Sequence, residues 1–415
     1  MSLSSLIRDL PFVLRRQGYP TPARTLTAFE ALRLASRQRV DFVMVGDNNQ
    51  LRDNHGLDWG FTEALTARFG MFATPIYGSY VQGSYTGYGG SWSTAATSGA
   101  PSELAALVLP NHGYRHLTNV QSETANVGIS INTASQFNVN ANIRCHFNYG
   151  TYPGDSGTMQ LRIRREESPW TQILLADEIS TNAGAYGRQH GYFDLAAAAR
   201  DYPLGFKWNA LVGPVMCYDM RVEDLDLDHG VSVHTMLGNS GYSMYDCVDA
   251  LDAYDTDAWG LYFGEMRRLQ LAKGQSPRIV LCACFGYHDR SEPSVPSLGW
   301  RKSMNADSPE AFVDNHEALL KLVDDTFVAN GWPTDEVSFL IMPTYRVSTP
   351  DDVDLVAYRE AVEDFAGAHP RCSFINLADL FAQTEMDALY NGGDTSVLLN
   401  SAAYETLAGR VVENF

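Results

Sequence analysis

The sequence predicts an α/β fold, in which a mostly parallel five-stranded sheet lies between two layers of helices and carries an inserted antiparallel β-sandwich. Three observations predict it. Strand-like segments alternate with helix-like segments after residue 229, and one buried strand lies near the N-terminus. In the stretch between them, apolar and polar residues alternate with a period of two. At 415 residues the chain exceeds one ordinary core, so a second domain or an insertion is expected.

The first part of the chain is expected to supply a helical segment and one strand of the parallel sheet. Residues 1–38 form an N-terminal helical segment, and residues 39–77 open the α/β domain. The expected elements are a helix within 26–35, a buried strand at 40–45, a helix at 57–69 and a short extended piece at 72–78.

The middle of the chain changes character twice. Residues 78–109 are rich in Gly, Ser, Thr and Tyr and form a connector, and residues 110–228 form the inserted β-sandwich. Apolar and polar residues alternate over 135–149, which predicts a strand with one buried and one wet face. Met159, Leu161 and Ile163 alternate in the same way after a turn, so the two strands are expected to form a hairpin. Further extended pieces are expected at 171–175, 192–195 and 215–222.

Residues 229–415 complete the α/β domain, because strands and helices follow one another regularly. The expected strands are 231–236, 278–285, 337–342 and 372–377, and the expected helices are 243–253, 256–273, 309–330, 353–368 and 401–413. With the strand at 40–45 there are five strands joined by helical crossovers. Such connections predict a parallel sheet covered on both faces.

Composition and charge exclude some classes of binding partner and indicate a compartment. A formal net charge of −19 excludes nucleic acid and an anionic membrane as expected partners, because polyanions need a basic surface. The sequence has no apolar run long enough to span a membrane, and its start lacks the layout of a secretory signal, so we expect synthesis in a reducing cytoplasm. The six cysteines are scattered, and Cys282 and Cys284 are expected to act as small hydrophobic residues in a strand.

No cofactor or metal is expected. Asp224, Asp226 and Asp228 resemble the start of a calcium loop, but the sixth position lacks glycine and the twelfth lacks glutamate. We therefore expect these aspartates to line the wet face of a strand.

Polar motifs follow the ends of the expected parallel strands, where open α/β folds place their ligands. In order, they are Gly46-Asp47-Asn48, the segment 238–242 with Gly241, Gly286-Tyr287-His288-Asp289, and Asp394 with Val397 and Leu398 before the last helix. Together they resemble the motifs of the SGNH hydrolases, also called GDSL esterases. The resemblance covers 39–76 and 230–415, and it implies a flavodoxin-like three-layer fold.

The resemblance also implies which groups are missing. The family has serine where this chain has Asn48, asparagine where it has His288, and a histidine that falls here on Val397 or Leu398. Asp394 is retained, and Gly241 matches the glycine that donates an oxyanion-hole amide. An amide cannot be activated as a serine hydroxyl can, and an aliphatic side chain takes no proton. The sequence therefore predicts that acyl transfer by the family's mechanism is lost.

Two other interpretations of these residues stay open. Asp47 and Asn48 are common in tight strand–helix turns, where their side chains cap the helix. A rewired dyad of Asp47 or Asp394 with His288 is the alternative.

Three functions follow from these interpretations. The first is a catalytically inactive structural or binding subunit of a large assembly, such as a head or tail appendage of a phage virion, whose partners are other subunits or copies of itself. The second is an esterase or carbohydrate deacetylase with a rewired site. The third is a glycan-binding module, in which exposed aromatics stack on sugar rings; the candidates are Tyr85, Tyr88, Trp92 and Trp170. Tyr85, Tyr88 and Trp92, which belong to the connector, would also serve as packing contacts of a long loop.

Overall fold

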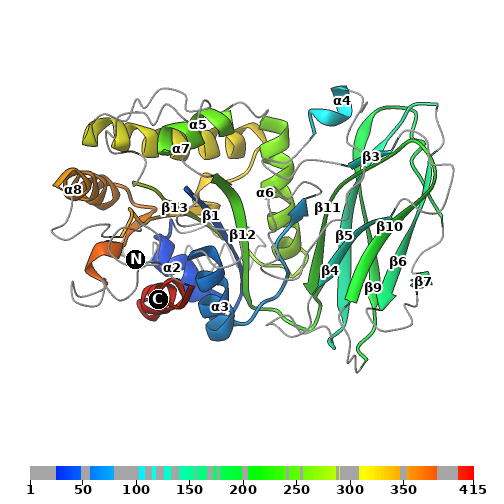
Figure 1. The fold of residues 1–415 in the computed structure, drawn as a ribbon, viewed down its shortest axis with the longest axis horizontal. Helices are drawn as coiled ribbons and strands as arrows, with labels where there is room; N and C mark the ends of the chain where they lie inside the picture. Colours follow the sequence, from blue (N-terminus) through cyan, green and yellow to red (C-terminus); the bar gives the residue numbers. More distant parts are fainter. Residues whose placement is uncertain are drawn as a thin grey trace, which may run out of the picture.

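A five-stranded parallel sheet forms the centre of the α/β part (Figure 1). Its strands are β1 (Arg39–Asp47), β12 (Gly230–Asn239), β13 (Ile279–Cys284), β14 (Val337–Ile341) and β15 (Cys372–Phe374), in the spatial order β12-β1-β13-β14-β15. Every neighbouring pair is parallel. In chain order this is 2-1-3-4-5, the flavodoxin-like arrangement. The predicted fold class is confirmed.

This computed structural model describes residues 25–47, 57–78, 102–107, 115–117, 126–131, 140–154, 157–165, 172–174, 178–198, 204–239, 243–252, 256–286, 289, 308–345, 353–380 and 401–415.

Helices cover both faces of the parallel sheet. One layer contains α2 (Ala28–Arg33), α3 (Leu57–Phe69) and α10 (Ser401–Glu413); the other contains α5 (Met244–Asp252), α6 (Thr256–Leu271), α7 (Pro309–Ala329) and α8 (Val353–Ala368). Short 3-10 turns are η1 (Leu34–Ser36), η2 (Thr334–Glu336) and η3 (Leu377–Asp379). Helices α3, α8 and α10 have the bounds that the apolar spacing predicts. The last strand ends at Phe374, earlier than predicted.

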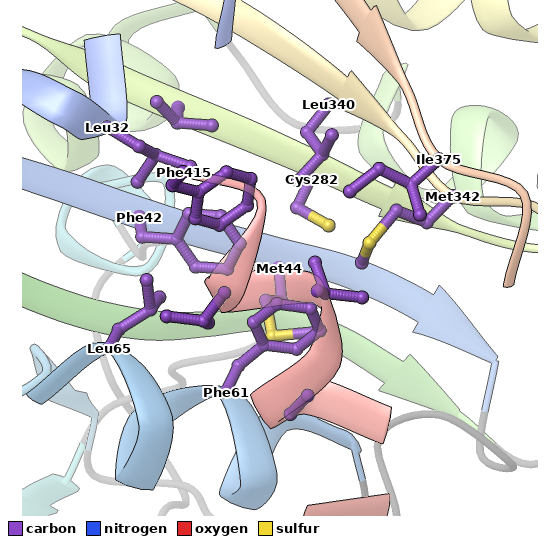
Figure 2. Packing of buried hydrophobic residues seen from close by; sticks show 14 of the residues in the cluster. Leu32, Phe42, Met44, Phe61, Leu65, Cys282, Leu340, Met342, Ile375 and Phe415 are labelled. Atoms are coloured by element: carbon purple, nitrogen blue, oxygen red, sulfur yellow. The ribbon is translucent and has the colours of Figure 1, made fainter. Parts of the chain in front are cut away.

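Alternate side chains of β1 pack into the two hydrophobic cores on either face of the sheet. Phe42 and Met44 face the layer of α2, α3 and α10, and Figure 2 shows Phe42 near Phe61 of α3 in that cluster. The rings of Phe42 and Phe61 lie 5.5 Å apart between centroids. Val43, by contrast, packs under the helices of the other layer. Burial on both faces explains why the strand is almost continuously apolar.

Two antiparallel sheets are inserted between α3 and β12 (Figure 1). One contains β4 (Asn126–Ile131), β10 (Leu204–Val212), β6 (Thr158–Arg165), β7 (Gln172–Leu174) and β8 (Ile179–Ser180). The other contains β2 (Tyr77–Gly78), β11 (Val215–Asp224), β5 (Ile143–Thr151), β9 (Gly187–Leu195) and β3 (Arg115–Leu117). Helix α4 (Ser102–Ala105) precedes most of them.

The predicted hairpin of β5 and β6 is wrong. Strand β5 pairs with β9 and β11, whereas β6 pairs with β10, β7 and β8 in the other sheet. Both strands do alternate, with Met159 and Leu161 buried in β6. Alternation shows which side chains of a strand face a core, but it does not name the strand beside it.

The wet face expected for β5 is also wrong. His146 and Asn148 lie on the polar side of this strand, yet each is only 3% exposed. Helix α6 covers them: Arg268 donates to His146 and Asn148 donates to Glu265. The polar side of β5 therefore faces the α/β part of the molecule. Asp224, expected on a wet strand face, is likewise buried at the end of β11.

A short segment after α3 joins the two parts by main-chain hydrogen bonds on both of its sides. On one side, Phe72 N–H donates to the Val231 carbonyl of β12 (3.2 Å). On the other, Thr74 N–H donates to Val222 O and Asp224 N–H donates to Phe72 O, both at 2.8 Å. The segment therefore links the β12 edge of the parallel sheet to β11, within the range where a short extended piece is predicted (72–78).

All six cysteines are buried and free, and Cys282 and Cys284 belong to the core beneath α2, α3 and α10. This confirms their expected role as small hydrophobic residues. In the part of the chain that the structure describes, no helix combines the length and the apolar character needed to span a bilayer.

Candidate functional site at the carboxyl edge of the parallel sheet

Three parallel strands end together at one edge of the sheet. Gly46 of β1 is level with Gly238 of β12 on one side and with Cys284 of β13 on the other, and Asp47 is level with Asn239. The strand order reverses here, because β12 and β13 flank β1. Such a switch point is where open α/β folds bind ligands. The structure therefore places the main chain of Asp47 at the position that the first motif predicts.

The chain leaves β13 through a fixed turn. The Phe285 carbonyl accepts from the Thr344 amide at 2.8 Å, which ties the turn to the segment after β14. Gly286 follows with φ +135°, a conformation that side chains rarely adopt, and an added Cβ would lie 3.3 Å from Cγ2 of Thr344. Glycine is required at the start of the third motif for a backbone reason.

The second and third motifs meet at the start of α5. The Met244 amide donates to the buried Oδ1 of Asp289 at 2.7 Å. Ser243 caps the same helix, since its Oγ accepts from the Asp246 amide (3.2 Å) while Oδ2 of Asp246 accepts from the Ser243 amide (3.0 Å). A carboxylate at a helix N-terminus is stabilised by the helix dipole. Asp289 therefore fixes the end of the third motif against the start of α5.

The helices that flank the first and last motifs also pack together. Helix α3 follows the first motif and α10 follows the last, and an added Cβ on Gly60 of α3 would lie 2.6 Å from the Tyr404 carbonyl of α10. Only glycine permits this approach. Near the start of α10 the hydroxyls of Tyr404 and Tyr345 are 3.2 Å apart, and Tyr345 lies beyond the carboxyl end of β14. The elements around all four motifs thus converge on one edge.

Most of the individual candidates lie outside the described residues. Asp47 is described only in its main chain, as the last residue of β1. The candidates outside the described part are Asn48, Gly241, His288, Asp394, Val397 and Leu398 in the motifs, and the aromatics Tyr85, Tyr88, Trp92 and Trp170. Their roles stay predictions.

A carboxylate–histidine pair that the sequence analysis missed lies where β1, β12 and α6 of the α/β part meet β11 of the antiparallel region, a contact here called the junction. Oδ1 of Asp41 is 2.8 Å from Nε2 of His234, and Asp41 also accepts from Arg221 and from Gln270 (2.8 Å). The Ile76 amide points at Nδ1 of His234 (3.3 Å), so the histidine donates from Nε2. Burial opposes ionisation of Asp41, but Arg221 and His234 outweigh it and lower its pKa. Burial lowers the pKa of His234 to about 4.

A second pair lies beside the first, because Arg39 and Glu223 are each two residues from Asp41 and Arg221 along β1 and β11. Nε2 of His146 is 2.8 Å from Oε2 of Glu223, and Nη1 of Arg268 is 3.0 Å from Nδ1 of His146. Glu223 also pairs with the buried Arg39. Burial disfavours the charged form of Glu223, yet His146 and Arg39 outweigh it and lower its pKa to about 2.

These two pairs belong to the packing of the molecule, away from the candidate site. Asp41 precedes Asp47 by six residues of strand, which is about 20 Å. Arg221 and Arg39 neutralise the carboxylates, and buried charges are stable only when paired in this way. A signal was present in the sequence, since Asp41 and His234 each interrupt an apolar strand. Across the described ranges, no three His, Cys, Asp or Glu side chains gather as metal ligands.

Comparison with known proteins finds relatives by structure alone. No family model matches the sequence, and no curated protein matches it. A peptidoglycan O-acetylesterase matches with a TM-score of 0.52 and 12% identity, covering 93% of this chain and 94% of that one. At this identity the likeness shows the fold alone. It confirms the SGNH hydrolase-like fold, with the antiparallel region included in the match.

Two carbohydrate esterases of family 2 match more distantly. The one from Myceliophthora fergusii, which has a carbohydrate-binding domain, has a TM-score of 0.30 at 12% identity, over 72% of this chain and 98% of that one. The one from Clostridium thermocellum has a TM-score of 0.30 at 10% identity, over 79% and 96%. These scores are too low to support an argument.

Proposed function

We propose that this protein binds a carbohydrate at the carboxyl edge of the parallel sheet and does not hydrolyse esters through a serine–histidine pair. The observation that carries the proposal is the position of Asp47 at the switch point of a fold shared with a peptidoglycan O-acetylesterase. The residue after Asp47 is Asn48, where the SGNH resemblance implies a serine.

The chemistry of the motifs supports binding without turnover. Asn48 offers a carbonyl oxygen and an NH₂ group, and His288 and Asp47 add further groups that suit sugar hydroxyls. Attack on an acetyl group needs a hydroxyl or thiol and a base to take its proton. Val397 and Leu398 cannot supply that base, and His369 is the last histidine of the chain.

Isothermal titration with soluble peptidoglycan fragments and acetylated xylan tests the binding, and release of p-nitrophenol from p-nitrophenyl acetate tests the inertness. We expect saturable binding that Asp47→Ala weakens by about tenfold, equivalent to about 1.4 kcal/mol. Asp325→Ala is the matched control, because the Asp325 side chain is 58% exposed and pairs only on the surface with Lys321.

Two outcomes contradict the proposal. If none of the glycans gives a heat of binding in the titrations, the proposal that the protein binds carbohydrate is wrong. Ester turnover above buffer that disappears in both Asp47→Ala and His288→Ala would replace an inert site by the rewired esterase of the sequence analysis.

Membership of a large assembly, a phage head or tail appendage included, stays a prediction. Sedimentation of the chain in its native extract tests it: an assembly subunit sediments with a particle, and a free 45.9 kDa chain does not.

A further inference from the structure

An exposed group of side chains at the outer strand of the antiparallel region forms a second candidate site, here called the ledge: Arg144, His190, Tyr192 and Asp194. Strand β9 lies at the end of its sheet and pairs with β5. His190, Tyr192 and Asp194 are alternate residues of β9, so they share one face of it. Arg144 of β5 lies directly opposite Asp194.

The ring of Tyr192 is both exposed and fixed. It is 55% exposed, and the guanidinium carbon of Arg144 lies 4.1 Å from its centroid. Asp194 in turn holds Arg144 by two parallel hydrogen bonds, of 2.6 Å to Nε and 2.7 Å to Nη2. The two hydrogen bonds fix the orientation of the guanidinium, so it holds the tyrosine ring from one side. An exposed aromatic that is already ordered loses little conformational entropy on binding.

His190 is fixed from beneath by the buried junction. Its Nε2 is 3.2 Å from Nδ1 of His146, whose other nitrogen is bound to Glu223. The rings of His190 and Tyr192 stack, with centroids 6.2 Å apart and planes at 28°. Desolvation, with the nearby positive charge of Arg268 next in order, lowers the pKa of His190 to about 4. The imidazole is therefore neutral at pH 7. Because Nδ1 of His146 accepts, Nε2–H of His190 donates to it, and Nδ1 of His190 is the acceptor that it offers to a ligand.

We propose that the ledge binds a neutral pyranose ring of a polysaccharide, an inference that rests on carbohydrate binding as the proposed function. The sugar packs against the part of the Tyr192 ring that Arg144 and His190 leave exposed, and its hydroxyls bond to the Arg144–Asp194 pair and to His190. This occupant fits the charges. The guanidinium and carboxylate neutralise one another, which disfavours an anionic ligand, and the acidic chain disfavours nucleic acid.

A tyrosine just before the same strand provides a matched control. Tyr186 precedes β9, is 41% exposed and packs edge-on against Tyr152, with centroids 6.0 Å apart and planes at 74°. It resembles Tyr192 in type and exposure but lies at the opposite end of the strand. Loss of either exposed ring leaves the cores intact.

The test is affinity electrophoresis of the full chain in gels containing xylan, β-glucan or soluble peptidoglycan fragments. Tyr192→Ala, Tyr192→Phe, Tyr186→Ala, Asp47→Ala and the double variant of Asp47 and Tyr192 are compared with the wild type. We expect Tyr192→Ala to weaken retention by about tenfold, and Tyr192→Phe and Tyr186→Ala to stay within about twofold, because stacking needs the ring alone. The double variant is expected to show both losses.

The variants separate the ledge from the edge of the parallel sheet. If Asp47→Ala abolishes retention while Tyr192→Ala behaves as Tyr186→Ala does, the ledge is overturned and the proposed function stands. If Tyr192→Ala abolishes retention and Asp47→Ala does not change it, the ledge is confirmed as the binding site and the proposed site at the parallel sheet is wrong. A wild type that no glycan retards overturns both.

Discussion

Asp41 and Val43 lie two residues apart on the same face of β1, are equally buried, and have opposite surroundings. Val43 packs among hydrocarbon, with Leu281 in the cluster under α5–α8. Asp41 is surrounded by Arg221, His234 and Gln270. One strand therefore passes within a few residues from a polar junction to an apolar core.

The difference shows that the two parts of the molecule are joined by different forces from those that build the parallel sheet. Helix α6 stands between them (Figure 1), and it bonds to both: Gln270 reaches Asp41 in β1, and Arg268 reaches His146 in β5. Apolar packing is non-directional, whereas paired charges and hydrogen bonds require one geometry. We infer that the buried charges fix how the antiparallel region sits on the α/β part.

The largest effect is expected from removing Asp41. Asp41→Ala leaves the buried Arg221 without its carboxylate and His234 without its acceptor, which costs about 3–5 kcal/mol of the free energy of unfolding. Urea denaturation monitored by circular dichroism measures it.

The surface pair of Lys321 and Asp325 provides the control for this loss. Asp325→Ala is expected to cost less than about 0.5 kcal/mol, because exposed ion pairs contribute little. Equal losses for Asp41→Ala and Asp325→Ala would contradict the role given to the junction.

An effect of intermediate size is expected from acid. The pKa of His234 is about 4 in the folded chain and 6.5 ordinarily, because burial disfavours its charged form. Between these values the unfolded chain binds a proton that the folded chain does not, so stability falls as the pH falls from about 6.5 to about 4. His234 alone should account for about 2 kcal/mol between pH 7 and pH 4.5, measured by urea titration at each pH.

His316 of α7 is a control that distinguishes the effect of titrating a buried histidine from the effect of losing a contact to Asp41. Burial lowers its pKa also to about 4, but its Nδ1 bonds to the Phe312 carbonyl within its own helix. Both His234→Gln and His316→Gln should flatten the pH dependence by similar amounts. At pH 7 His234→Gln should be the more destabilising, since it disturbs a bond to Asp41. An unchanged slope in both variants would refute the assignment of neutral buried histidines.

Of the two substitutions in β1, Val43→Ala is expected to have the smaller effect. It removes two buried methyl groups from the apolar end of the same face of β1, for a cost of about 2 kcal/mol. The same urea titrations measure it, and a loss as large as that of Asp41→Ala would erase the contrast between the two ends of the strand.

Much of the parallel sheet could be predicted because its signals are local. The apolar run at 40–45 and the helical spacing at 57–69, 353–368 and 401–413 each depend on one segment's own periodicity. The site was predictable in position for a related reason. Parallel strands joined by crossovers end at one edge, so Asp47 had to lie beside the ends of β12 and β13.

By itself, the sequence determined the order of the elements, the five parallel strands and the identities of the groups at their carboxyl edge, Asn48 among them. Only the tertiary structure decided that β5 and β6 lie in different sheets, that the polar side of β5 is buried against α6, and that Tyr192 and Arg144 meet at the surface. The physical reason is range. Periodicity is a property of one segment, whereas strand partners and buried ion pairs join residues far apart in the chain. Asp41 is 193 positions from its ion-pair partner His234 and 238 positions from Ile279, its partner across the sheet.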